Sequence, residues 1–229
     1  MRSLLKYTTY FLCLGLGSSL VAEVAPTFKS TLFEKGTLIV SEDFDEKFGP
    51  EVFGGQVAKR AILKDGAMII TPRFTSKEEA MKKLKRDHHL NTGIVFHITK
   101  LPDQFVCHLR FKWEFSDENY QGPQFQIGHH MIKFRYNENG GHKLSIPEVG
   151  AFDVPESGAK WDEWMDMEIE YKPGILLLRV NGHTATYEDP KLNAKNLKNK
   201  RSIQLDFKGK EDPKSRLIFD YVRSWKGEG

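Results

Sequence analysis

Three carboxylates alternate with apolar residues within residues 165–171: Asp166, Glu168 and Glu170. The alternation predicts a β-strand, on which side chains two positions apart share a face and lie ~6.6 to 6.8 Å apart along the strand. Carboxylates paired at such a spacing can act as general acid and general base. The same pattern also fits the solvated face of an ordinary strand, so both interpretations stay open.

A second polar set follows the clearest strand pattern in the chain, residues 105–115. Its members are planar or charged groups that form bidentate hydrogen bonds and, beside an aromatic ring, suit the recognition of sugars. The set comprises His108, Arg110, Lys112 and Glu114, together with Gln124, Gln126 and His130 from the next segment. If this face is concave, we expect a ligand-binding groove; if it is convex, it is the solvated side of a half-buried strand.

Other catalytic patterns are weak. Adjacent residues on a strand point to opposite faces, so neither His88-His89 nor His129-His130 can easily chelate one ion. The sequence contains no G-x-S-x-G elbow and no phosphate-binding glycine loop. These patterns argue against zinc, serine-hydrolase and nucleotide chemistry.

Mostly period-two alternation predicts the elements that must position these groups. Residues 165–171, 175–180 and 183–187 form a predicted three-stranded meander, because Asn181-Gly182 is a strong hairpin signal. Further strands are predicted at residues 37–44, 57–63, 67–71, 92–98, 124–127, 131–136, 143–146, 202–207 and 216–225. So many short strands between Gly, Pro and Asn turns predict an antiparallel sandwich or barrel.

One segment departs from this pattern. Ser76 and Glu79 form a capping box, and Glu78 and Glu79 precede Lys82 and Lys83 by four residues, so residues 77–86 are predicted to form a short surface helix. Among the tryptophans, we expect Trp113 and Trp225 in the core. Trp161 and Trp164 flank a turn and fit either a stacking platform or packing over the end of the sandwich.

The first residues resemble an export signal. Arg2 and Lys6 precede an apolar run at residues 7–16, and small residues follow it, which predicts a signal peptide at residues 1–22 with cleavage after Ala22. Cleavage after Ser19 and an uncleaved anchor are the alternatives. We therefore expect a secreted or periplasmic protein with one domain at residues 23–229.

Composition narrows the function classes further. The chain of 229 residues carries 34 basic and 31 acidic side chains, and loss of Arg2 and Lys6 would leave it close to neutral. This charge does not suggest a nucleic-acid partner, and no apolar run reaches the ~18 to 20 residues of a membrane span. Of the two cysteines, Cys13 lies in the predicted leader, so Cys107 has no partner within the exported chain and fits a buried thiol.

Several patches together resemble the concanavalin A-like lectin/glucanase superfamily, in particular secreted bacterial laminin-G-like and 3-keto-disaccharide hydrolase-like domains. They are Glu42-Asp43-Phe44, Lys64-Asp65-Gly66-Ala67-Met68, residues 109–113, Trp161 and Trp164 before residues 168–171, Val180-Asn181-Gly182 and residues 219–222. The resemblance covers about residues 36–226. It implies an all-β jelly-roll sandwich of two curved antiparallel sheets, whose concave face commonly binds carbohydrate.

The resemblance also bears on chemistry. Members that cleave glycosides use two carboxyl groups, but their order of Glu, Asp and Glu is here Asp166, Glu168 and Glu170. Relatives often hold a structural Ca²⁺, which requires oxygen ligands, and Asp43, Asp45 and Asp220 occupy the matching regions. No other cofactor is expected.

Two functions follow as hypotheses. The first is a secreted carbohydrate-associated domain that binds a polysaccharide or oligosaccharide, or takes part in its hydrolysis, with no nucleic-acid partner and no membrane attachment after cleavage. The alternative is a non-catalytic protein-interaction or structural module of the cell envelope.

Overall fold

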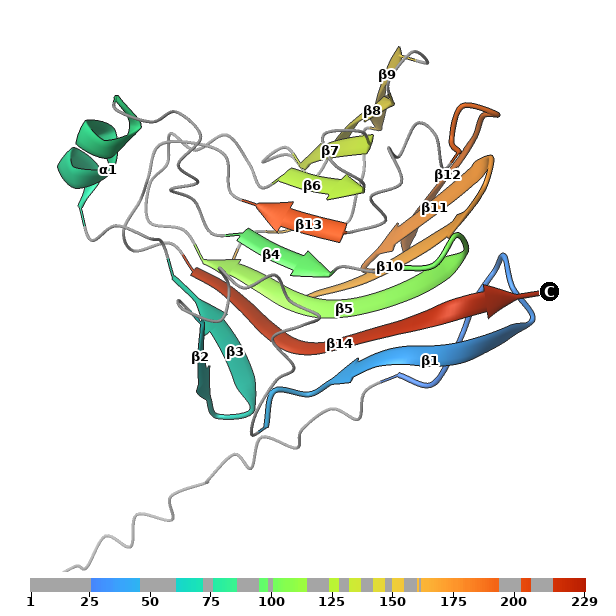
Figure 1. Ribbon diagram of the computed structural model, residues 1–229, viewed down its shortest axis with the longest axis horizontal. Coiled ribbons are helices and arrows are strands. Elements are labelled where there is room, and N and C mark those ends of the chain that lie inside the picture. Colours follow the sequence, from blue (N-terminus) through green and yellow to red (C-terminus); the bar gives the residue numbers. More distant parts are fainter. Residues whose placement is uncertain are drawn as a thin grey trace, which may run out of the picture.

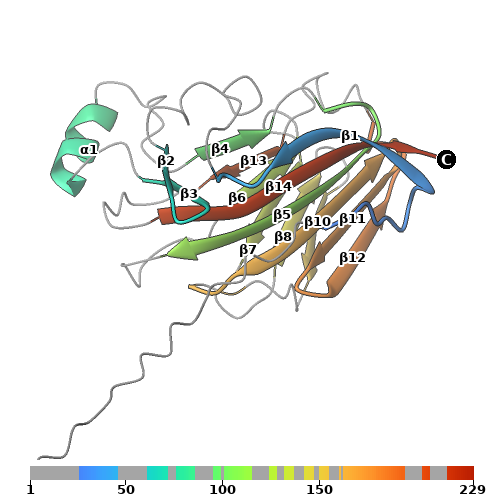
Figure 2. The same cartoon turned by 90° about the horizontal axis from the view of Figure 1, so that it is seen from below.

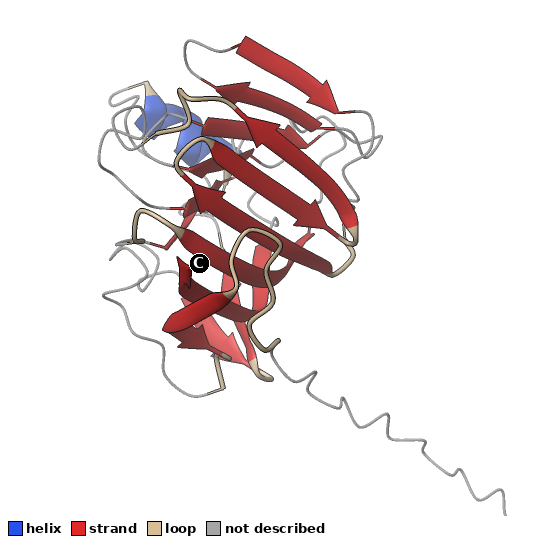
Figure 3. Cartoon of the chain, turned by 90° about the vertical axis from the view of Figure 1, so that its right-hand side faces the viewer, coloured by secondary structure: helices blue, strands red, loops and turns tan. Residues whose placement is uncertain are grey.

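Two antiparallel β-sheets face each other in the computed structural model (Figure 1). The structure describes residues 26–45, 61–71, 76–85, 95–98, 101–114, 124–127, 132–136, 142–146, 150–154, 160, 162–193, 203–206 and 216–229. Strands account for most of the regular structure in these segments (Figure 3). The predicted all-β sandwich is therefore confirmed.

The large sheet has eight strands. Its main path runs through β12 (His183–Glu188), β11 (Ile175–Val180), β10 (Met165–Lys172), β5 (Phe105–Glu114), β14 (Arg216–Glu228), β3 (Ala67–Ile70) and β2 (Ala61–Lys64). In addition, β1 (Lys35–Glu42) pairs with the C-terminal part of β14. The predicted meander is present as β10, β11 and β12.

The small sheet has six strands, in the order β4 (Val95–Ile98), β13 (Ile203–Asp206), β6 (Gln124–Ile127), β7 (Ile132–Tyr136), β8 (His142–Ile146) and β9 (Gly150–Val154). All these strands were predicted except β9, whose sequence GAFDV has no clear alternation. Strand β13 lies between β4 and β6 although it follows them by a long stretch of chain.

Two hairpins turn where the sequence allows positive φ. Asn181 and Gly182 have φ values of 47° and 85°, and Asp65 and Gly66 have 54° and 71°. Successive positive φ angles define the type I′ turn, whose twist matches the flanking strands. The turns therefore set the registers of the β11–β12 and β2–β3 pairs.

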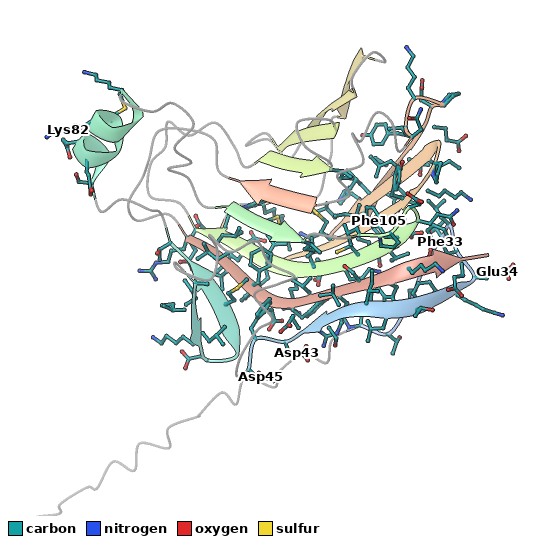
Figure 4. All side chains as sticks on the ribbon, viewed as in Figure 1. Phe33, Glu34, Asp43, Asp45, Lys82 and Phe105 are labelled. Carbon is teal, nitrogen blue, oxygen red and sulfur yellow. The ribbon has the colours of Figure 1, made fainter. Side chains whose placement is uncertain are left out.

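The core fills the space between the sheets. Alternate residues of β5 from Phe105 to Trp113 belong to one buried cluster with Ile98 of β4 and Ile127 of β6. Figure 4 shows Phe105 among the side chains between the layers. The other face of β5 therefore points away from the small sheet, and we call this side of the large sheet the outer face.

Curvature gives the outer face its shape. Strands β5 and β14 bend so that their concave side faces β4 and β13 (Figure 1), which makes the outer face convex. Figure 2 shows this face from below, with β1, β14, β5, β10, β11 and β12 side by side. The polar residues of β5 therefore lie on a convex surface, which is the second of the two alternatives that the sequence left open.

Residues 26–34, which we call the N-terminal strap, cross the outer face before β1 begins. The Phe28 ring packs edge-on against Trp225, with centroids 5.7 Å apart, and Phe33 joins Val106 and Trp225 in a second buried cluster. Trp225 is buried as predicted, but in this cluster rather than in the main core. The strap thus covers the part of the outer face near the C-terminal end of β14.

The predicted helix is present as α1 (Lys77–Leu84). Its N-terminus is capped as expected, because the Glu79 N–H donates to Ser76 Oγ at 3.2 Å. The helix lies well to one side of the sheets (Figure 1). Within the described parts of the chain, no helix is long and apolar enough to span a membrane.

Candidate functional site

The outer face brings together two sets of residues that the sequence analysis treated separately. In the antiparallel β5–β10 pair, Arg110 lies opposite Asp166 and His108 lies opposite Glu168. The carboxylates of β10 are therefore neighbours of the polar groups of β5. Glu168 of β10 also pairs with Arg179 of β11, so polar groups from three strands meet on the outer face.

The residues predicted from the following segment do not join this surface. Gln124 and Gln126 lie in β6, which belongs to the small sheet, on the other side of the core from the outer face. A single groove that combines them with His108, Arg110, Lys112 and Glu114 is therefore wrong. His130 lies outside the described residues, as do Trp161 and both His-His pairs.

One end of the outer face carries an aromatic ring. Trp164 immediately precedes β10 and is 38% exposed. The guanidinium carbon of Arg110 lies 5.6 Å from the Trp164 ring centroid, and Lys112 Nζ lies 5.7 Å from it. Cations at this distance interact favourably with an indole ring. Trp164 is thus held in place by charged residues while part of its surface stays open to solvent.

Carboxylates complete this end, which we call the Trp164 platform and define as Arg110, Lys112, Glu114, Trp164 and Asp220. Arg110 Nε lies 3.5 Å from Asp220 Oδ2, and Lys112 Nζ lies 2.7 Å from Glu114 Oε1. Burial raises the pKa of Asp220, and the Arg110 charge opposes this increase. The platform therefore offers planar charged groups of both signs around a ring.

The strap forms a small pocket farther along the same face. The pocket has a volume of about 150 Å³ and is lined by Pro26, His108, Asp166, Met167, Glu168, Arg179, Gly182 and Tyr221. We call it the strap pocket. Asp166 lies opposite Arg110 and two residues after Trp164, so the pocket adjoins the Trp164 platform.

His108 is a buried member of this pocket, with an exposed fraction of 3%. Its ring packs edge-on against Trp225 at 5.0 Å, and it hydrogen-bonds the backbone of Lys29. Burial lowers its pKa from 6.5 to about 4, although the Glu170 charge opposes this change. The imidazole is therefore neutral near pH 7.

The three carboxylates of β10 have different partners. Glu170 is fully buried and accepts hydrogen bonds from Ser30 Oγ and from the backbone N–H groups of Thr31 and Leu32. Glu168 pairs with Arg179, and Asp166 accepts the Tyr221 hydroxyl at 3.0 Å. Glu170 therefore anchors the strap and does not face a ligand.

The predicted calcium ligands do not form a group that could hold a metal, although Asp43 and Asp45 lie near enough to Asp220 to raise its pKa. Asp43 pairs with Arg223, Asp220 lies beside Arg110, and Asp45 Oδ1 lies near Gly66 in the β2–β3 turn. Figure 4 shows Asp43 and Asp45 at the far end of β1 from Phe33 and Glu34. No group of three or more His, Cys, Asp or Glu side chains within the described segments could hold a metal ion. The geometry therefore gives the calcium prediction no support.

Several solved glucanase structures share this architecture. The laminarinase from Rhodothermus marinus matches with a TM-score of 0.57 and 11% identity over 85% of this chain and 99% of that chain. The endo-β-1,3(4)-glucanase SCLam matches with a TM-score of 0.55 and 10% identity over 85% and 92%. A lichenase from a mouse hindgut metagenome matches with 0.52 and 12% identity over 82% and 98%.

The fold is a concanavalin A-like jelly roll. This confirms the family resemblance at the level of the fold. No protein-family model matches the sequence, and no curated protein matches it. At identities of 10 to 12%, the likeness to these structures shows a shared fold but does not assign an activity to this chain.

Sequence reasoning missed three parts of the outer face of this jelly roll. Arg179 pairs with Glu168 and donates to Thr184 Oγ1 at 3.0 Å. Arg179 is the one charged residue in the otherwise apolar sequence of β11, and this was the signal by which it could have been found. Tyr221 and the strap gave no such signal. A bulge in β14 between Phe219 and Tyr221 interrupts the alternation there, and the strap has no regular structure and so no periodic pattern.

Proposed function

We propose that this protein is a secreted carbohydrate-binding domain that holds a polysaccharide or oligosaccharide on the outer face of its large sheet. The observation that carries the proposal is the exposed surface of Trp164 beside Arg110 and Lys112. Sugar rings stack on aromatic faces while their hydroxyls hydrogen-bond planar polar groups. The likeness to laminarinases and lichenases supports a carbohydrate ligand in preference to another polar one.

The arrangement of the described carboxylates favours binding of the glycan without its cleavage. Glu170 is buried under the strap, and Glu168 is paired with Arg179. Two free carboxyl groups on either side of a ligand are what hydrolysis requires. We therefore expect no release of reducing ends from β-glucans, and release that is lost in Glu168→Gln would contradict this part of the proposal.

A glycan array tests the proposal directly. The Trp164→Ala variant removes the ring, and we expect its affinity for the bound glycan to fall about tenfold, or about 1.4 kcal/mol. Arg110→Ala should weaken binding by a similar factor, because it removes hydrogen-bond donors and the cation beside the ring. Trp164 is 38% exposed, so Trp164→Ala should leave the melting temperature nearly unchanged. The Arg110 side chain is only 19% exposed and pairs with Asp220, so Arg110→Ala should also lower the melting temperature.

Lys160→Ala serves as the matched control, since Lys160 is exposed and pairs with Glu163 at 3.3 Å, outside the platform. It should bind like the unmodified protein. If no glycan binds, or if Trp164→Ala binds as well as the control, the proposal is wrong. A blank array together with capture of an envelope protein would favour the interaction module instead.

A further inference from the structure

The strap pocket carries an imbalance between hydrogen-bond donors and acceptors. Its donors are already engaged: Arg179 donates to Glu168, to Thr184 and to Thr31 Oγ1, and the Tyr221 hydroxyl donates to Asp166 Oδ1. Three acceptors receive no hydrogen bond from the described residues, namely His108 Nε2, Glu168 Oε1 and Asp166 Oδ2. The pocket therefore lacks a group that donates.

The tautomer of His108 determines that its Nε2 atom is one of these acceptors. Its Nε2 atom is buried and has no hydrogen-bond partner, so the bond to the Lys29 backbone must use Nδ1. Donation from Nδ1 leaves a lone pair on Nε2, which makes this atom an acceptor. Burial also keeps the ring neutral, since it lowers the pKa of His108 to about 4.

His108 Nε2 lies 3.8 Å from Glu168 Oε1. Two acceptors at that distance do not bond each other. A single donor placed between them can reach both, and a buried acceptor left without a donor costs about 1–3 kcal/mol. With Asp166 on the same pocket wall, the preferred occupant has several N–H or O–H donors and no acceptor of its own.

We propose that the strap pocket binds a primary ammonium group, and that its natural ligand is an amino sugar unit of the glycan held on the Trp164 platform. An ammonium group has three donors and no acceptor, which matches the three unengaged acceptors. Its positive charge faces Asp166 and Glu168. Among the lining residues the one cationic side chain, Arg179, is already paired, and Lys29 of the strap acts on Glu168 from outside the lining.

Size and position agree with this ligand. A volume of about 150 Å³ holds the amino group and the adjoining ring atoms of one sugar, but not a longer stretch of chain. An N-acetylated sugar fits poorly, because its carbonyl oxygen would meet acceptors. Since Asp166 lies two residues from Trp164, a stacked sugar and its neighbour can occupy the platform and the pocket together.

The inference rests on the proposed carbohydrate function, so the experiment separates the two. Calorimetric titrations compare three tetrasaccharides with the purified protein: a glucosamine oligomer, its N-acetylated counterpart and a glucose oligomer. We expect the glucosamine oligomer to bind at least tenfold more tightly than the other two. In Asp166→Asn, which keeps an acceptor for Tyr221 but removes the charge, that preference should fall below threefold.

Two controls exclude a general charge effect. Glu188→Gln removes one charge at the far end of the β11–β12 hairpin, and it should keep the full preference. Trp164→Ala should weaken all three oligomers by the same factor. In addition, the ¹⁵N resonance of His108 Nε2 should shift when the glucosamine oligomer is added and stay unchanged with the glucose oligomer.

Each of the remaining outcomes would disprove either the ammonium site or the carbohydrate function as well. Equal binding of the three oligomers would disprove the ammonium site while carbohydrate binding stands. No binding of any oligomer, together with a blank glycan array, would disprove both. A preference that survives in Asp166→Asn, or that Glu188→Gln also abolishes, would show that the amino group is not recognised in this pocket.

Discussion

At the scale of single residues, the burial of His108 has a measurable consequence for stability. The ring lies among Glu168 and Glu170 of β10, Arg179 of β11, Lys29 of the strap and Arg223, which is its partner in β14. Burial is the largest effect and holds the folded pKa near 4; the Glu170 charge favours protonation, and the Arg179 and Lys29 charges oppose it. The unfolded chain has the ordinary value of about 6.5.

We therefore expect His108 to destabilise the protein in acid. Between about pH 6.5 and pH 4, the unfolded chain binds a proton at His108 that the folded chain does not bind. The free energy of unfolding must then fall as the pH is lowered through this window, by at most about 1.4 kcal/mol per pH unit from this group. Urea unfolding at several pH values measures the slope.

His108→Gln provides the control, because the amide retains a donor for Lys29 but does not titrate. Its slope between pH 6.5 and pH 4 should be smaller than that of the unmodified protein. Glu168 and Asp220 act in the opposite direction, since burial raises their folded pKa values and protonation then favours the folded state. Identical slopes in the two proteins would show that burial does not lower the pKa of His108.

At the scale of elements, the strap is held by few but strong interactions. Three backbone or hydroxyl donors of residues 30–32 converge on Glu170, and the Leu32 and Phe33 N–H groups also donate to Ser30 Oγ. Phe33 packs so closely on Gly227 that a Cβ there would lie 2.6 Å from the ring. The strap is thus an integral layer of the outer face.

The Glu170→Gln variant should release the strap from the outer face. The amide presents N–H donors to donors of the strap, so we expect a loss of about 2 kcal/mol in the free energy of unfolding. Amide exchange at Thr31 and Leu32 should accelerate at least tenfold, as measured by hydrogen exchange with mass spectrometry. The exposed Glu188→Gln should change neither quantity, and unchanged exchange in Glu170→Gln would contradict the anchoring role.

The strands were predictable from the sequence because side-chain alternation is a local property. The β5 pattern of Cys107 and Leu109 against His108 and Arg110 gave both the strand and its two faces correctly. The Asn181-Gly182 turn gave the register of its hairpin in the same way. In contrast, Ser30 meets Glu170 across 140 positions of sequence, and no local pattern encodes such a contact.

At the scale of the whole molecule, alternation does not say which sheet a strand joins. Residues 124–127 follow β5 in sequence but lie in the small sheet, next to β13 and β7. The predicted groove failed for this reason, although the strands on which it rested are present. The same limit applied to curvature, since the polar face of β5 is as consistent with a concave sheet as with the convex one observed.

The predicted export signal ends a few residues before the strap. We predict that an export-competent host releases a chain that begins at Glu23, because the charged start, apolar run and small residues form a complete signal. Intact-mass analysis of the exported protein measures this start directly.

Cleavage after Ala22 leaves three residues before Pro26, which lines the strap pocket. A mass that includes residues 1–22 would contradict the prediction, and a start at Leu20 would move the cleavage site to Ser19. As a control, Arg2 and Lys6 replaced together by Glu should leave the unprocessed chain inside the cell, since a signal peptide requires positive charges at its start.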